Sequence, residues 1–194
     1  ESKIEDAQRR QILTTFAYGT GLGPTQVAKS VSGVSDRQIA FINQRHVTTE
    51  KLEATIREVI NGYNRFWLPK LWGDAKRAGA DGTQWDLYEN NLLSERHIRY
   101  GGYGGIAYYH VSDNYIALFS HFIPCGVWEA IYILDGLTKN DSDIQPDTLH
   151  GDTQAQSTPV FGLAYLLGIK LMPRIRNWKD LKCYKPSPEA MYKH

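Results

Sequence analysis

The chain has 194 residues, enough for one hydrophobic core with an added helical part. Its 22 basic and 21 acidic residues give a formal net charge of +1, so any DNA-binding surface must be local. Cys125 and Cys183 lack the spacing of a thiolate metal site and are typical of a reducing compartment. The most apolar run, residues 116–134, is interrupted by polar side chains and a proline, which excludes a membrane span.

The first 74 residues are expected to form a helical subdomain, because apolar residues recur at helical spacing along them. Ser35 and Gln38 have the spacing of a capping box that opens the third predicted helix. The second and third helices resemble a helix-turn-helix, but Gly33 lies one position later than in the usual DNA-reading motif. This spacing favours a packed helical hairpin over a base-reading element.

Two stretches of strand type follow, at residues 105–113 and 115–123, and Ser-Asp-Asn at the turn between them predicts a β-hairpin. The glycine-rich stretch 100–105 is either a loop that approaches a phosphate or a mobile entry to the hairpin. Residues 127–137 have helical spacing. The residues expected on the buried side of this helix are Val127, Ile131 and Leu134, with Trp128 as a further candidate.

Residues 149–176 are typical of a strand end, a tight turn, a helix and a further strand. Pro159 suits the first position of a helix, Thr158 can cap it, and Gly168 suits a left-handed exit. These signals predict a helix over about residues 159–167.

Two aspartates lie at positions where strands are expected. Asp152 follows a predicted strand, and ligands bind at the carboxyl ends of strands in open α/β sheets. Taken alone, Asp152 could merely close a turn, because Gly-Asp is a common turn pair. Asp81 also lies beside a glycine, with Thr-Gln shortly after it. One acid on the first strand and another at the end of the fourth are the layout of the ribonuclease-H-like fold.

A set of short motifs, taken in order, is recognisable. The motifs are Asp81-Gly, Gly-Tyr-Gly-Gly, Tyr108-Tyr-His-Val-Ser-Asp, Leu134-Asp-Gly-Leu, Asp152-Thr, Leu166-Leu-Gly and Pro173-Arg-Ile-Arg. From about Tyr18 to about Tyr184 the chain resembles the catalytic region of the Tn-three family of replicative transposases. The resemblance implies an α/β fold with a ribonuclease-H-like mixed sheet over residues 75–185, incomplete, after the helical subdomain 1–74 and before a tail at 186–194.

The resemblance also implies a DDE-type transposase in which Asp81 and Asp152 match the first two acids of the family's Asp-Asp-Glu set. Two Mg²⁺ ions roughly 3.5 to 4 Å apart can serve both ends of a phosphodiester displacement, with Mn²⁺ as a substitute. In the family the glutamate comes far downstream. Glu189 has a spacing known from other enzymes of the superfamily, but it lies in a tail without a helical run. We therefore expect a fragment that lacks its third ligand and is inactive on its own.

Basic residues concentrate near the end of the chain. Lys170, Arg174 and Arg176 would neutralise DNA phosphates beside the metal site, although a charge run is usually only a solvated surface. His150 and Thr153 adjoin the second aspartate and could hydrogen-bond to it. No His-x-x-x-His pair supports a zinc site.

The partners implied are transposon terminal repeats and target DNA, with a homo-oligomer at full length and no membrane. With no cleavable signal sequence visible, a bacterial cytoplasmic location is expected, at the nucleoid when DNA is bound. Two alternatives stay open. One is a non-catalytic DNA-binding or assembly module, and the other is a hydrolytic nuclease of the same fold that uses water alone as its nucleophile.

Overall fold

The computed structural model describes residues 4–98, 101–182, 184–185 and 187–191. The chain divides into two compact units, Glu1–Ile56 and Arg57–His194, and the division lies within helix α4 (Thr49–Asn64). In the part of the chain that is described, no helix is both long and apolar enough to cross a membrane. Cys183 and Tyr100, which carried sequence-based expectations, lie outside the described residues.

The first unit is helical, as predicted. Its helices before α4 are α1 (Ala7–Gly19), α2 (Gly23–Ser30) and α3 (Asp36–His46). Helices α2 and α3 contact each other, and the unit's small core contains Ala17, Val27, Val34 and Ile39. The predicted capping box is confirmed: the Ser35 hydroxyl accepts from the Gln38 backbone N–H at 3.2 Å, and the Gln38 side-chain oxygen accepts from the Ser35 backbone N–H at 3.0 Å.

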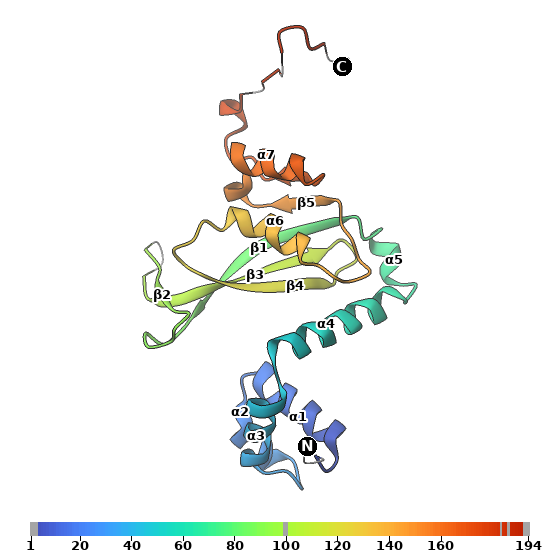
Figure 1. Ribbon diagram of the computed structural model, residues 1–194, viewed down its shortest axis with the longest axis vertical. Coiled ribbons are helices and arrows are strands. Elements are labelled where there is room, and N and C mark those ends of the chain that lie inside the picture. The colour runs from blue at the N-terminus through green and yellow to red at the C-terminus, as the bar shows by residue number, and fades with distance from the viewer. Residues whose placement is uncertain (1–3, 99–100, 183, 186, 192–194) are drawn as a thin grey trace. The chain divides into compact units, whose positions relative to one another are not determined.

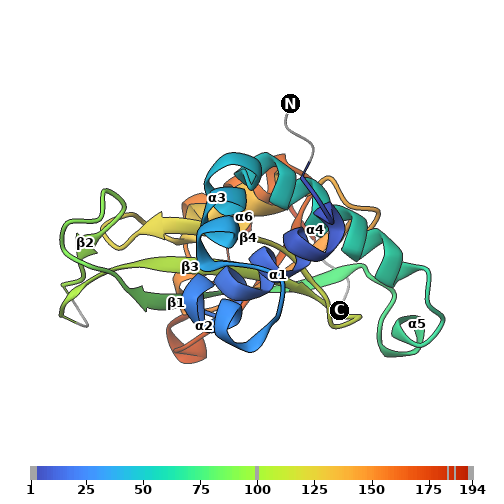
Figure 2. The ribbon, with the colours of Figure 1, turned by 90° about the horizontal axis from the view of Figure 1, so that it is seen from below.

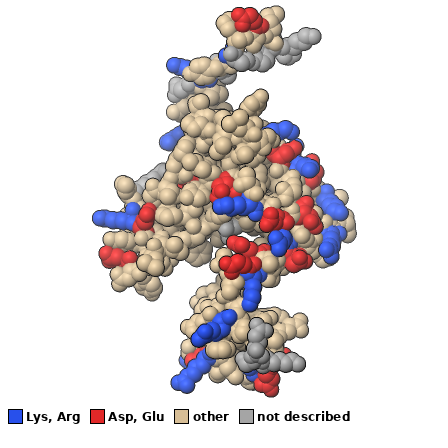
Figure 3. All heavy atoms as spheres, in the orientation of Figure 1, with Lys and Arg blue, Asp and Glu red and all other residues tan. Residues whose placement is uncertain are grey.

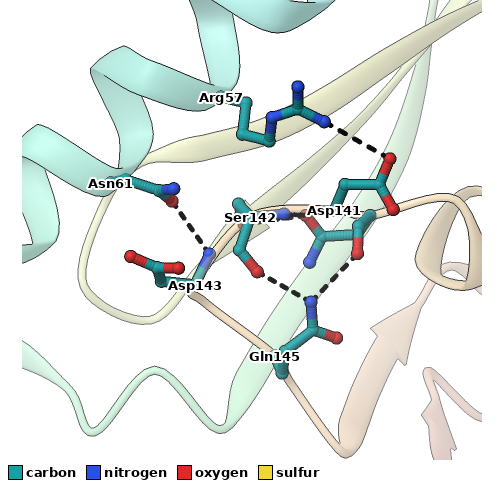
Figure 4. A network of polar contacts seen from close by, with 7 residues as sticks. Arg57, Asn61, Asp141, Ser142, Asp143 and Gln145 are labelled. Carbon is teal, nitrogen blue, oxygen red and sulfur yellow. Dashed lines mark hydrogen bonds and ion pairs between the residues drawn. The ribbon is translucent and has the colours of Figure 1, made fainter.

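The second half of α4 belongs to the second unit, so the compact units divide at residue 56 rather than at the expected residue 74. The physical reason is burial and hydrogen bonding. Ile60 is 2% exposed and joins the main core, and the Tyr63 hydroxyl donates to the Asn114 carbonyl at 2.8 Å. Asn61 accepts from the backbone N–H of Asp143 at 2.8 Å (Figure 4).

A mixed sheet forms the centre of the second unit (Figure 1). Its strands are β1 (Arg77–Asp86), β2 (Glu95–Arg96), β3 (Tyr103–Ser112), β4 (Ala117–Pro124), β5 (Thr148–Gly151) and β6 (Lys170–Pro173). The principal order is β4-β3-β1-β5-β6, with the short β2 beside the start of β3. Pairs β4/β3 and β3/β1 are antiparallel, whereas β1/β5 and β5/β6 are parallel. This order and these directions confirm the predicted ribonuclease-H-like sheet.

Strands β1 and β3 are the longest in the sheet and run together toward the β2 end of the molecule (Figures 1 and 2). Close backbone approach explains two of the glycines there. A Cβ at Gly104 would overlap the Trp85 carbonyl, and one at Gly105 would overlap the Phe122 ring. Part of the glycine-rich stretch expected as a loop is therefore buried strand.

Besides the second half of α4, the second unit contains the short helix α5 (Pro69–Trp72) and two longer helices. Helix α6 (Ala130–Thr138) contacts β3 and β4, and helix α7 (Thr158–Leu166) contacts α6 and β6. The predicted buried side of α6 was wrong in part, because Ile131 is 45% exposed while Ala130 and Ile133 are fully buried. The helix begins at Ala130, after the residue assumed in the sequence, so a different stripe faces the sheet. The predicted exit of α7 is confirmed, since Gly168 has φ 71° and the Ile169 N–H reaches the Ala164 carbonyl at 2.9 Å.

The predicted hairpin is present with a longer turn. Strand β4 begins at Ala117, two residues later than expected, because Tyr115 takes a left-handed conformation with φ 65°. The Tyr115 N–H donates to the Ser112 carbonyl at 2.9 Å and closes the turn. The hairpin thus brings β4 onto the outer edge of β3 and leaves β1 free to pair with β5.

Candidate active site

Asp81 and Asp152 come from adjacent parallel strands. Residues of β1 pair with residues of β5 in a register that ends with Gly79 opposite His150. When this register is continued by two residues, Asp81 on β1 matches Asp152, which immediately follows β5. The fold thus brings two acids far apart in sequence to matching positions at the carboxyl end of β5.

Each aspartate has one carboxylate oxygen engaged by a neighbouring backbone amide. The Gly82 N–H donates to Asp81 Oδ1 at 2.9 Å, and the Gln154 N–H donates to Asp152 Oδ1 at 2.9 Å. The second bond makes Asp152 the N-cap of the short 3₁₀ helix η1 (Thr153–Ala155). These local bonds orient the carboxylates and confirm that Asp152 closes a turn. Closing the turn uses only one carboxylate oxygen, so it is compatible with a role of Asp152 as a metal ligand.

A third acid, Glu129, lies in the same neighbourhood. Burial raises the pKa of Glu129, and the charge of Asp152 raises it further, while a side-chain hydrogen bond with Gln154 opposes the shift. Burial likewise raises the pKa of Tyr108, and the negative charges that add to this effect are those of Asp152, Glu129 and Asp81. The charges of all three carboxylates therefore act on the buried Tyr108 side chain.

Sequence reasoning missed Glu129 because it stood at the start of a predicted helix with no motif around it. One signal was available. Glu129 is the acid inside the most apolar run of the chain, residues 116–134, where burial of a charge carries a cost. Only the pairing of β1 with β5 and the packing of α6 show that this acid lies near the aspartates.

His150 and Thr153 flank Asp152, as expected from their positions. His150 is exposed on β5, and Thr153 is half-buried at the start of η1. Within the described residues, no side-chain hydrogen bond links either of them to the Asp152 carboxylate; a bonded role for either residue stays a prediction.

The basic residues divide into two groups. The Arg174 N–H donates to the Gly151 carbonyl at 2.9 Å, which sets Arg174 beside the Asp152 segment, and the Arg176 N–H donates to the Gln156 side chain at 3.3 Å. Both arginine residues are exposed. Lys170 lies at the other end of β6, opposite Thr148, so the fold does not bring it to the aspartates.

Acidic and basic side chains are intermixed at the surface. The Lys170 ammonium lies 3.6 Å from a carboxylate oxygen of Asp147, and both side chains are exposed, so this pair is worth little in stability. On the face drawn in Figure 3, acidic and basic side chains lie side by side rather than in a patch of one sign. A surface for phosphates must accordingly be local, as the net charge of +1 indicates.

Carboxylate oxygens of the two aspartates suit a hard divalent cation. Mg²⁺ keeps several waters and is commonly held by one or two carboxylates, so the donor set present here fits it. Among the described residues, no group of three or more His, Cys, Asp or Glu is arranged to hold a metal ion. Glu189 lies in an exposed turn of the tail, and no described contact brings it to the aspartates.

A protein-family model described as the Tn3 transposase DDE domain matches residues 1–194. The chain belongs to this family. The sequence-based recognition of the Tn-three family of transposases is confirmed.

The matching relatives are named transposases. The transposase for transposon Tn3926 of Escherichia coli is 29% identical over 93% of this chain and 18% of its own length. The transposase for transposon Tn1546 of Enterococcus faecium is 28% identical over 91% of this chain, and that for Tn501 of Pseudomonas aeruginosa is 29% identical over 96%. The chain spans about one fifth of the length of these relatives, from 18% to 19%. Among solved structures, a Mos1 transposase paired-end complex covers 90% of this chain and 60% of its own at 13% identity, with a TM-score of 0.35.

Proposed function

We propose that this chain is the catalytic region of a DNA transposase that cleaves phosphodiester bonds at transposon ends and joins the freed 3′-hydroxyl to target DNA. The observation that carries the proposal is the matched register of Asp81 and Asp152 on adjacent parallel strands. The match of the whole chain to the Tn3 DDE domain supports it.

Asp81 and Asp152 would hold the divalent cations, Mg²⁺ in the cell with Mn²⁺ as a substitute. When bound, two such ions stabilise the attacking and leaving oxygens of an in-line displacement at phosphorus. The chain's own part is to fix the two carboxylates, each through one backbone amide, and to place them at the carboxyl end of β5, where DNA can reach them. A third carboxylate, the glutamate of the family's Asp-Asp-Glu set, is proposed to come from outside residues 1–194.

The partner proposed is DNA, and Arg174 and Arg176 are its proposed phosphate contacts. Both follow β6 and are exposed, and the backbone of Arg174 is bonded to the residue before Asp152. Guanidinium groups there would neutralise phosphates without reading bases. Lys170 lies at the start of β6, opposite Thr148, and would contact a different phosphate.

The test of catalysis uses a polypeptide that contains this segment and has the length of the relatives. Asp81→Asn and Asp152→Asn should each reduce Mg²⁺-dependent nicking of transposon-end DNA to background, because each removes a charged ligand. Asp86→Asn, at the exposed end of β1, is the matched control and should nick normally. Nicking retained in both active-site variants would refute the proposal.

The same assay separates the alternatives. Joined products between transposon ends and target DNA indicate a transposase, whereas hydrolysis products alone indicate a nuclease. DNA binding without nicking in the unaltered protein would favour an assembly module.

The arginines are tested through the salt dependence of DNA affinity. Each phosphate neutralised contributes about 0.9 to the slope of log affinity against log salt for duplex DNA. Replacing Arg174 and Arg176 together with alanine should therefore lower the slope by about 2. Lys182→Ala with Lys185→Ala removes the same charge from exposed positions further along the chain and serves as the control. An unchanged slope in the arginine variant would remove Arg174 and Arg176 from the DNA surface.

A further inference from the structure

The carboxylate of Glu129 fills space directly beside the Asp81 segment. A Cβ at Gly82, the residue after Asp81, would lie 3.0 Å from Glu129 Oε2 and 3.0 Å from Tyr108 Cδ2. The absence of a side chain at Gly82 thus leaves room for the Glu129 carboxylate against β1. This packing gives a structural reason for glycine directly after Asp81.

Glu129 also reaches the second aspartate segment. The charge of Asp152 raises the pKa of Glu129, so the two carboxylates lie close enough to interact, and the backbone N–H of Gln154 holds Asp152 by donating to its Oδ1 at 2.9 Å. Glu129 therefore lies against the Asp81 segment and near the Asp152 segment, and it comes from a third element, α6.

The helix itself does not use this carboxylate. Glu129 is the N-cap residue of α6, but its side chain makes no capping hydrogen bond. None of the ion pairs found among the described residues includes Glu129, Asp81 or Asp152. A half-buried carboxylate beside two others lowers stability unless positive charge offsets it; the charge of His97 does so in part, and a bound cation would do so further.

We propose that Glu129 is a third acidic side chain of the divalent-cation site, supplied by α6 to support the cation held by Asp81 and Asp152. Because the described acids do not form a three-ligand cage, Glu129 acts as a positioning residue beside the cation's water ligands rather than as a direct ligand. This inference rests on the proposed function, and its test separates the two.

The experiment titrates the 194-residue chain with Mn²⁺ and measures affinity by the enhancement of water-proton relaxation. Glu129→Gln keeps the size of the side chain and removes its charge. We expect Mn²⁺ affinity to fall by about 10-fold, the lower end for residues that support metal ligands. Glu129→Asp keeps the charge on a shorter side chain and should bind with intermediate affinity. Asp135→Asn, the matched control, removes one charge from the exposed Asp135–Lys139 pair of α6 and should bind as the unaltered chain does.

Thermal unfolding without metal distinguishes positioning from a merely structural role. Glu129→Gln relieves repulsion among the acids, so its midpoint should equal or exceed that of the unaltered chain; a lower midpoint would overturn the inference. If Asp81→Asn and Asp152→Asn weaken Mn²⁺ binding while Glu129→Gln does not, only the role of Glu129 is refuted. If all three variants bind as the unaltered chain does, the proposed cation site fails and the inference fails with it.

Discussion

At the scale of single residues, burial governs the behaviour of the histidine on β3. His110 is fully buried, and its Nε2 lies 2.7 Å from the Ile133 carbonyl, while no described group bonds its Nδ1. Burial lowers the pKa of His110 from 6.5 to about 4, against the effect of the Ile133 hydrogen bond, and the charge of His121 lowers it further. Only one ring nitrogen of His110 therefore has a hydrogen-bond partner among the described residues.

This depressed pKa predicts acid sensitivity of the second unit. The folded state binds fewer protons than the unfolded state, so the stabilisation is present above pH 6.5 and is lost as pH falls toward 4. The loss should be on the order of 3 kcal/mol. Urea unfolding at several pH values checks it: His110→Gln should remove this part of the pH dependence, and His150→Gln, at an exposed position of β5, should not. Equal pH dependence in all three proteins would contradict the assignment.

At the scale of elements, the fit of α6 against the sheet depends on one missing side chain. A Cβ at Gly136 would overlap the ring of Phe119 and lie 2.8 Å from Cε1 of His110. The close approach of α6 to β3 and β4 therefore requires glycine in the middle of a helix, where glycine is otherwise unfavourable. Helix α7 also has a central glycine, Gly162, but nothing lies within 4 Å of its Cβ position.

The two helical glycines predict opposite outcomes for the same substitution. Gly136→Ala should destabilise the protein by about 1 to 3 kcal/mol, because overpacking outweighs the gain in helix propensity. Gly162→Ala should stabilise it by up to about 1 kcal/mol, since only propensity changes. Chemical denaturation of both variants decides. Stabilisation by Gly136→Ala would show that the α6 contact is looser than the structure indicates, and destabilisation by Gly162→Ala would contradict the open surroundings of Gly162.

At the scale of the whole molecule, the boundary between the two units lies within a helix rather than in a linker. The residues of α4 that follow Ile56 bury Ile60 and bond to Asn114 and to the 141–143 segment. Figure 4 shows how Arg57 and Asn61 reach that segment from the same helix. The second unit thus includes half of a helix that the helical spacing of apolar residues had placed in the helical subdomain.

Truncation tests this boundary. A polypeptide of residues 49–194 keeps all of α4, whereas one of residues 75–194 begins at the boundary expected from sequence. The shorter one loses the Ile60 contacts and should be less stable by on the order of 3 kcal/mol or more. Urea midpoints of the two polypeptides provide the measurement, with full-length chain as the reference. Identical midpoints would place the boundary after α4.

What the sequence by itself determined was whatever local chemistry decides: the order of strands and helices, the Ser35 capping box, the Gly168 exit and the two aspartates that the family's motifs mark. Caps and turns are set by neighbouring residues, so they can be recognised without a partner element. Only the tertiary structure decided which side of α6 is buried, where α4 divides between the units and that Glu129 lies beside Gly82 and Gln154. Each of these features depends on packing between segments that are distant in the chain. A local sequence pattern does not specify the surface against which its element will pack.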